Sequence, residues 1–195
     1  LFRNQRENVD KSGSGNLNIV SESLKFFNLS SITKIVSANS QKITHENMLS
    51  YTDSHSVDFF SVDGCHTSFC TLNDLKLAFG VLSKTGIVMI DDPFRLDWPG
   101  VTLGVGMFMH LRDDVSIFAY GYNKVFMCFK DQFSRYQREA EKLCKGIGTT
   151  CKTKIGLNGM RDKVVRFSGI SFDREKSKNS TCIAEAKFTP KLSTK

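Results

Sequence analysis

The chain has 195 residues, which suits one domain with or without a tail, and 40% of them are hydrophobic, enough to form a core. No run of about 18 apolar residues occurs, so the sequence predicts no membrane span. The net charge of +7 is uneven. Residues 142–195 hold 13 Lys and Arg against 4 Asp and Glu, whereas residues 1–141 hold 14 against 16. The excess positive charge therefore belongs to the C-terminal part of the chain.

The chain begins at Leu1 rather than Met, and we expect it to be a fragment of a longer protein. Its six cysteines have spacings that fit neither a zinc motif nor a compact disulfide framework. This pattern favours free thiols, which persist in reducing compartments. We therefore predict a cytoplasmic protein.

The first elements are predicted from capping residues and hydrophobic spacing. Asn16 precedes apolar residues at helical spacing, which predicts a helix that begins at Leu17 and ends near Asn28. Residues 32–38 are short and β-branched, which favours a strand, and residues 45–51 are consistent with a short helix.

A strand, a helix and a second strand follow. Residues 57–62 form an apolar run that ends at Asp63 and Gly64. Apolar residues then recur at helical spacing from Phe69 to Leu82, and Lys84 and Gly86 are expected to end that helix. Residues 86–90 have the composition of a buried strand.

The pattern continues with a helix that begins at Pro99, then strands over residues 115–120 and 124–129 joined by a turn. Alternating helices and strands predict an α/β fold: a Rossmann-like three-layer sandwich with a mostly parallel sheet and an antiparallel C-terminal edge pair. We divide the chain into a domain over residues 1–130 and a basic extension over residues 131–195. A helix over 132–144 and strands over 163–172 and 181–188 are predicted there, outside the core.

Acidic residues follow two successive predicted strands. Asp63 follows the first strand, and Asp91 and Asp92 follow the second. Ligands of open parallel sheets bind at the carboxyl ends of strands, so these acids are expected to share one cleft. Three carboxylates in one cleft repel one another unless a cation or a hydrogen-bonding ligand neutralises them. The alternative is that the acids only cap the helices that follow.

The residues around these acids resemble the class I S-adenosylmethionine-dependent methyltransferases. Residues 57–66 resemble a family segment in which strand four ends in Ile-Asp-Gly-x-His, residues 82–92 resemble strand five, and residues 98–101 resemble a Pro-Gly-Val element that follows it. Residues 120–128 resemble the closing strand seven. The resemblance covers residues 1–130, and it implies that the family's first strands, with their glycine-rich loop and ribose-binding acid, are missing here.

The resemblance implies roles for individual residues. Asn39 and Ser40 stand where the family places a polar pair near the adenine of S-adenosylmethionine, with Asp63 and Gly64 also beside this cofactor. Asp63 and His66 are the implied catalytic residues, with His66 as a general base that removes the acceptor proton. A further implication is a Mg²⁺ site.

That metal site would consist of Asp63, Asp91 and Asp92, because hard cations favour several oxygen ligands. The expected function is methyl transfer to an oxygen or nitrogen of a small-molecule or glycan acceptor, with or without this cation. The alternative is a truncated or degenerate methyltransferase-like domain that acts as a binding module. Nucleic acid is not the expected partner, because the basic tail lacks the interleaved aromatic residues of base-stacking surfaces.

Overall fold

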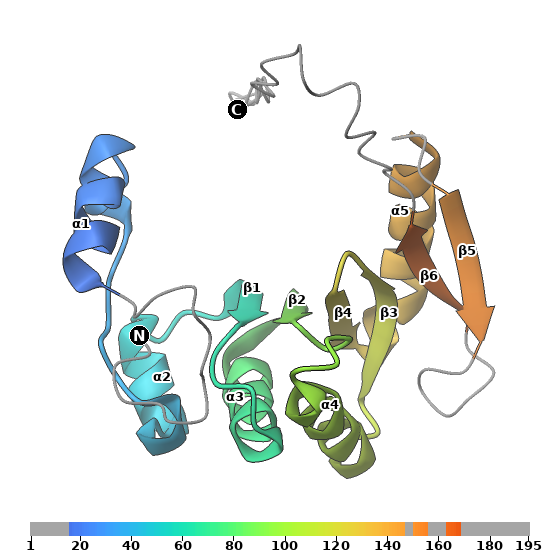
Figure 1. Ribbon diagram of the computed structural model, residues 1–195, viewed down its shortest axis with the longest axis horizontal. Helices are drawn as coiled ribbons and strands as arrows, with labels where there is room; N and C mark the ends of the chain where they lie inside the picture. The colour runs from blue at the N-terminus through green and yellow to red at the C-terminus, as the bar shows by residue number, and fades with distance from the viewer. Residues whose placement is uncertain (1–15, 147–149, 156–162, 169–195) are drawn as a thin grey trace.

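The computed structural model describes residues 16–146, 150–155 and 163–168, and they form one mixed sheet with helices on both faces (Figure 1). The α-helices are α1 (Leu17–Phe26), α2 (His45–Tyr51), α3 (Ser68–Val81), α4 (Pro99–Leu111) and α5 (Phe133–Gly146). The strands are β1 (Val57–Val62), β2 (Leu82–Asp91), β3 (Val115–Gly121), β4 (Lys124–Phe129), β5 (Thr150–Ile155) and β6 (Lys163–Ser168). Three short 3₁₀ helices complete the described elements: η1 (Ser30–Ile32), η2 (Ser40–Lys42) and η3 (Lys130–Gln132).

The strand order in the sheet is β1-β2-β4-β3-β6-β5. β1 and β2 run parallel, and β4 is antiparallel to β2, as predicted. The sheet is mixed rather than mostly parallel, since three of its five described pairings are antiparallel. The antiparallel pair β3–β4 also lies inside the sheet, because β6 pairs with β3 and β5 pairs with β6.

Two helices cover one face of the sheet and one covers part of the other. α3 and α4 pack side by side beneath β1, β2 and β4 (Figure 1), where Phe108, Leu75 and Ile90 are fully buried. On the opposite face, Tyr136 of α5 stacks on Phe118 of β3, with ring centroids 5.1 Å apart. The predicted Rossmann-like α/β architecture, with helices on both faces, is confirmed.

Part of the C-terminal region belongs to the core, which the sequence did not predict. Ala140 of α5 and both Val164 and Val165 of β6 are buried in the two hydrophobic clusters. The predicted helix over 132–144 and the start of the strand at Lys163 are confirmed. Residues 169–172 and the predicted strand over 181–188 lie outside the described residues, and the domain division at residue 130 stays a prediction.

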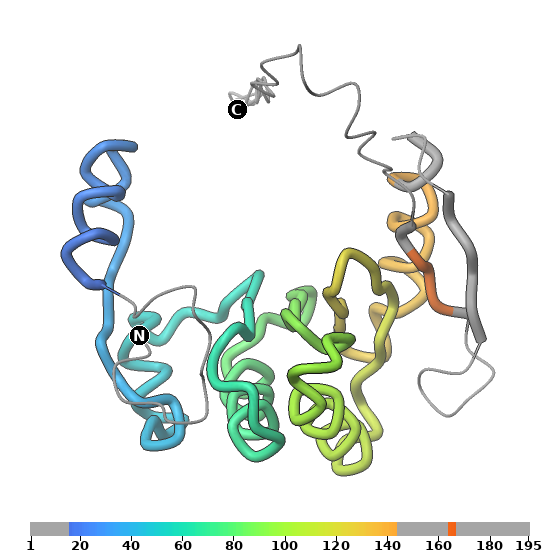
Figure 2. The backbone as a smooth tube through the Cα atoms, viewed as in Figure 1, coloured from blue at the N-terminus to red at the C-terminus, as the bar shows by residue number. Residues whose placement is uncertain are grey.

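The predicted strand over residues 32–38 is wrong. Residues 33–39 are irregular, and the side chains from Ile32 to Asn39 are all exposed. A β-branched run needs a neighbouring strand to satisfy its backbone, and within the described residues no strand lies beside this segment. In Figures 1 and 2, the whole segment from α1 to α2 lies beyond the β1 edge of the sheet.

The predicted end of the third helix is also wrong. α3 ends at Val81, and Leu82 already pairs with Val57 as the first residue of β2. Gly86 lies inside this strand, where an added Cβ would come within 2.9 Å of the Val57 carbonyl oxygen. The glycine therefore permits a close approach of β2 to β1 and does not end the helix.

The part of the chain that the structure describes contains no helix able to cross a membrane.

Candidate functional site

The loop after β1 and the loop after β2 meet at the carboxyl ends of these parallel strands. Asp63, His66 and Asp91 line one small cavity there, together with apolar residues of β1, β2 and α4. The carboxyl ends meet because β1 and β2 pair in register from Phe59 opposite Ile87 to Val62 opposite Ile90. The structure thus brings together the acids and the histidine that the sequence singled out.

His66 is held between an aromatic ring and a carboxylate. Its imidazole stacks on Trp98, with ring centroids 4.4 Å apart and an angle of 19° between the planes. Its Nε2 lies 3.3 Å from Oδ2 of Asp92, and only 9% of the His66 side chain is exposed. A carboxylate in this position orients an imidazole.

The loop that carries His66 is packed tightly against the start of α4. A Cβ on Gly100 would come within 2.3 Å of the His66 carbonyl oxygen, so only glycine permits this approach. Gly100 follows Pro99 in the first turn of α4, and Trp98 precedes them. The Trp-Pro-Gly element therefore places both the stacking ring and the close backbone contact of His66.

Asp63 lies in the field of the two other acids. Burial, followed by the charges of Asp91 and Asp92, raises the pKa of the Asp63 carboxyl above its ordinary value. His66 and Lys124 act in the opposite direction. The three acids therefore interact, as the sequence predicted, but they do so together with the side chains of His66 and Lys124.

The predicted Mg²⁺ site finds no support in the structure. Among the described residues, no three His, Cys, Asp or Glu side chains are arranged to hold a metal ion. Asp91 Oδ2 lies instead 2.6 Å from Nζ of Lys124, and Asp92 is engaged by His66 and by the side-chain amide of Asn123. Asp91 and Asp92 are thus already engaged by Lys124, His66 and Asn123, so we derive no step through a metal.

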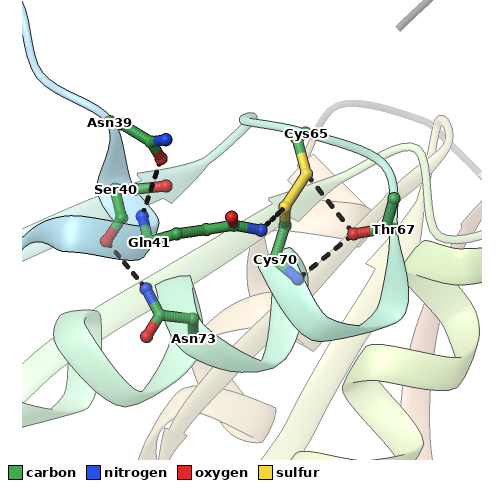
Figure 3. Close-up of a disulfide and its surroundings, with 7 residues drawn as sticks. All are labelled: Asn39, Ser40, Gln41, Cys65, Thr67, Cys70 and Asn73. Atoms are coloured by element: carbon green, nitrogen blue, oxygen red, sulfur yellow. Dashed lines mark hydrogen bonds between the residues drawn. A yellow bond between two sulfur atoms is a disulfide. The ribbon is translucent and has the colours of Figure 1, made fainter. Parts of the chain in front are cut away.

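Of the four predicted cofactor residues, Asp63 and Gly64 line this cavity, whereas Asn39 and Ser40 are not among its lining residues. Asn39 caps η2, its side chain accepting a hydrogen bond from the Gln41 backbone, and the Ser40 carbonyl accepts one of 2.8 Å from the Asn73 amide (Figure 3). Ser40 also hydrogen-bonds Asp74. A Cβ on Gly64 would lie 2.7 Å from Asp74 Oδ2. Ser40 and Gly64 therefore both lie next to the Asp74 carboxyl.

Asp74 is a buried carboxyl beside Ser40 and Gly64 that the sequence did not reveal. It lies on the buried face of α3, only 7% exposed, and its Oδ1 has no hydrogen-bond partner among the described residues. Burial raises the pKa of its carboxyl, against the effect of hydrogen bonds from Ser40 and Asn73. One signal was available: an acid that follows Leu72 and precedes Leu75 in a helix of apolar spacing.

A disulfide closes the loop that carries His66 (Figure 3). It joins Cys65, directly after Gly64, to Cys70 in the first turn of α3, with Cα atoms 5.8 Å apart. The Gln41 amide lies 2.6 Å from the Cys70 sulfur, and the Thr67 side chain caps the helix (Figure 3). The prediction of free thiols is therefore wrong for these two cysteines, while Cys128 is a buried free thiol whose pKa is raised by burial to about 12.

A second hollow lies at the other end of the sheet. It is lined by Lys84 near the start of β2, Phe129 at the end of β4, Asp114 before β3, and Lys130 and Asp131 of η3. It contains none of the predicted site residues. The cavity at the carboxyl ends of β1 and β2 is therefore the candidate functional site.

Comparison with known proteins identifies a family for part of the chain. A family model described as a methyltransferase domain matches residues 3–93, which include β1, α3, β2 and the acids Asp63, Asp91 and Asp92. No curated protein and no solved structure matches the chain. The family implies S-adenosylmethionine as cofactor, and the family match together with the mixed α/β sheet assigns this part of the chain to the class I S-adenosylmethionine-dependent methyltransferases.

Proposed function

We propose that the chain catalyses the transfer of a methyl group from S-adenosylmethionine to an oxygen or nitrogen atom of a small-molecule or glycan acceptor. The observation that carries the proposal is the fixed position of His66 in the cavity that Asp63 and Asp91 also line. The family match supplies the class of reaction.

In this proposal, His66 removes the proton of the acceptor. Its imidazole is held by the Trp98 ring and the Asp92 carboxylate, so little freedom remains to be lost when the acceptor binds. Asp92 stabilises the imidazolium that forms, since its Oδ2 lies 3.3 Å from Nε2. His66 is thus the general base and Asp92 its positioning residue.

The cofactor is proposed to lie along Asn39, Ser40, Asp63 and Gly64. Ser40 and Gly64 both approach Asp74, whose buried and unpartnered Oδ1 matches a ligand that brings hydrogen-bond donors. When bound, the cofactor supplies a methyl group on a sulfonium sulfur, and the electron pair of the broken bond stays on that sulfur. The chain's own residues position this group and take up the acceptor proton.

The test is a transfer assay with radiolabelled S-adenosylmethionine and a panel of hydroxyl and amine acceptors. Replacing His66→Ala is expected to lower the rate about 10²- to 10⁴-fold, the usual effect of removing a general base. His55→Ala, in the exposed loop before β1, is the matched control and leaves the rate unchanged. Thermal melting of both variants shows whether the fold is intact.

The alternative, a methyltransferase-like domain that binds without catalysis, predicts a different result. S-Adenosylmethionine would then bind in calorimetry, or fail to bind, with no transfer to any acceptor of the panel. Equal transfer rates for the wild type and a folded His66→Ala variant would contradict only the assignment of His66 as the base, and not the methyl transfer itself. These outcomes separate the function of the chain from the assignment of its base.

A further inference from the structure

We propose that Lys124 is the resident cation of the acidic cluster formed by Asp63, Asp91 and Asp92, and that this cluster takes up a divalent metal ion only when Lys124 is removed. Its ammonium lies 2.6 Å from Asp91 Oδ2. About a third of the Lys124 side chain and a quarter of the Asp91 side chain are exposed (32% and 23%), so water screens this pair less than a surface pair.

Both carboxylate oxygens of Asp91, the last residue of β2, and of Asp92, which follows it, are already engaged by other groups of the chain. Asp91 accepts a hydrogen bond of 2.9 Å from the Asp92 backbone at Oδ1 and contacts Lys124 at Oδ2. Asp92 accepts from the Asn123 amide at Oδ1 and lies beside His66 at Oδ2. A divalent cation such as Mg²⁺ needs carboxylate oxygens as ligands, so it would have to displace these partners.

The position of Lys124 is fixed by the backbone of the hairpin. Tyr122 and Asn123 have φ angles of 50° and 61°, as in the two-residue turns that match the twist of paired strands. Lys124 is the first residue of β4 and pairs directly with Asp91. The Asp92 backbone N–H also donates to the Asn123 carbonyl at 3.1 Å, so the turn is attached to the acidic loop.

The cation changes the electrostatics of the whole cluster. Lys124 and His66 oppose the effect of Asp91 and Asp92 on the Asp63 carboxyl. A fixed ammonium beside the acids can stabilise negative charge that develops on an acceptor atom, the task a metal ion performs in other sites. This catalytic meaning rests on the proposed function, whereas the binding behaviour of the cluster does not.

The test uses Mn²⁺ alone as the probe, with the full chain in 150 mM salt and free Mn²⁺ measured by electron paramagnetic resonance. The wild type is expected to retain no stoichiometric Mn²⁺. Lys124→Met, which keeps the aliphatic stem, is expected to bind Mn²⁺ at least about tenfold more tightly, and Asp91→Asn in the same chain should cancel this gain. Lys34→Met is the matched control, because it removes the lysine of an exposed Lys–Asp pair, 3.2 Å from Asp53.

Two results would overturn the inference. One is stoichiometric Mn²⁺ binding by the wild type that Asp91→Asn abolishes; the other is a folded Lys124→Met chain with no gain in binding. Lys124→Gln serves if the Met variant melts early, and the wild-type measurement decides even if neither folds. Because Mn²⁺ retention is read without methyl transfer, a chain inactive in the transfer assay can still support or refute the role of Lys124.

Discussion

The segment before β1 and the region from β1 to β4 contrast sharply in packing. Within residues 16–56 no side chain is buried, and nine large apolar residues between Leu17 and Val36 are exposed. In α3 alone, nine residues are buried. The helices of the first segment form from local signals, such as the Asn16 cap of α1 and the capping box of α2, whereas those of the second form by packing on the sheet.

Both α2 and η2 of the first segment contact α3, and the η2 contacts lie beside the predicted cofactor residues. Ser40 contacts Asn73 and Asp74, and Gln41 contacts Cys70, all on α3. The predicted cofactor residues therefore lie at the boundary between a well-packed core and a segment that contacts it through polar side chains. Disturbing each side should therefore have effects of very different size.

The largest expected effect is in the core. Replacing Phe108→Ala removes a fully buried ring that packs 5.2 Å from the ring of Phe79, and it should lower the free energy of unfolding by about 3–5 kcal/mol. Phe26→Ala, 81% exposed on α1, should change it by less than about 0.5 kcal/mol. Urea unfolding followed by circular dichroism compares them, and similar losses would mean that the two regions pack alike.

The next effect concerns the disulfide at the boundary. Replacing both Cys65 and Cys70 with Ser should cost about 2 kcal/mol, because the bond closes a short loop. Dithiothreitol should lower the melting temperature of the wild type to about that of the double variant. It should leave the double variant unchanged, and an equal shift in both proteins would assign the effect to other thiols.

A smaller effect should depend on pH. The pKa of the Asp74 carboxyl is raised in the folded chain from its ordinary value of 3.8. As pH rises past 3.8, this carboxyl therefore loses its proton in the unfolded chain before it does so in the folded chain. The contribution of Asp74 to stability is therefore full below that value and declines until pH passes the folded pKa. Asp74→Asn should lack this decline, so its advantage over the wild type should grow with pH and then level off.

Melting temperatures between pH 3.5 and 7 measure that difference. Asp113→Asn, at an exposed position before β3, is the control. The raised pKa of Asp63 affects the wild type and Asp74→Asn equally, so it cancels in the comparison. A difference that shrinks as pH rises would show that the Asp74 carboxyl prefers its charged form in the fold.

The smallest effect should be local to α1. The Asn16 side chain accepts hydrogen bonds from the backbones of Asn18 and Ile19, and Asn16→Ala should cost this helix about 1 kcal/mol. Because no residue of α1 is buried, the main unfolding transition should not move. Hydrogen exchange of the α1 amides measures the loss, and a shift of the main transition would show that α1 is coupled to the core.

Local sequence signals predicted much of the fold and of the site. Caps, hydrophobic spacing and Pro99 located α1, α2, α3 and α4, and strands that end in acids located the cavity. The strand predicted over 32–38 failed because strands depend on neighbours that a sequence window does not contain. The Cys65–Cys70 bond and the partnership of Lys124 with Asp91 were missed for a related reason: spacing alone does not show which side chains meet.

The turn at Tyr122 and Asn123 has a consequence for sequence change. Side chains of a strand alternate between its two faces, so the identity of the residue opposite Asp91 depends on the number of residues in this turn. Deleting one residue there would place Val125 instead of Lys124 opposite Asp91. All the following side chains of β4 would then point to the opposite face of the sheet. A length change of a single residue, which alters no acid of the site, would thus exchange its positive charge for an aliphatic side chain.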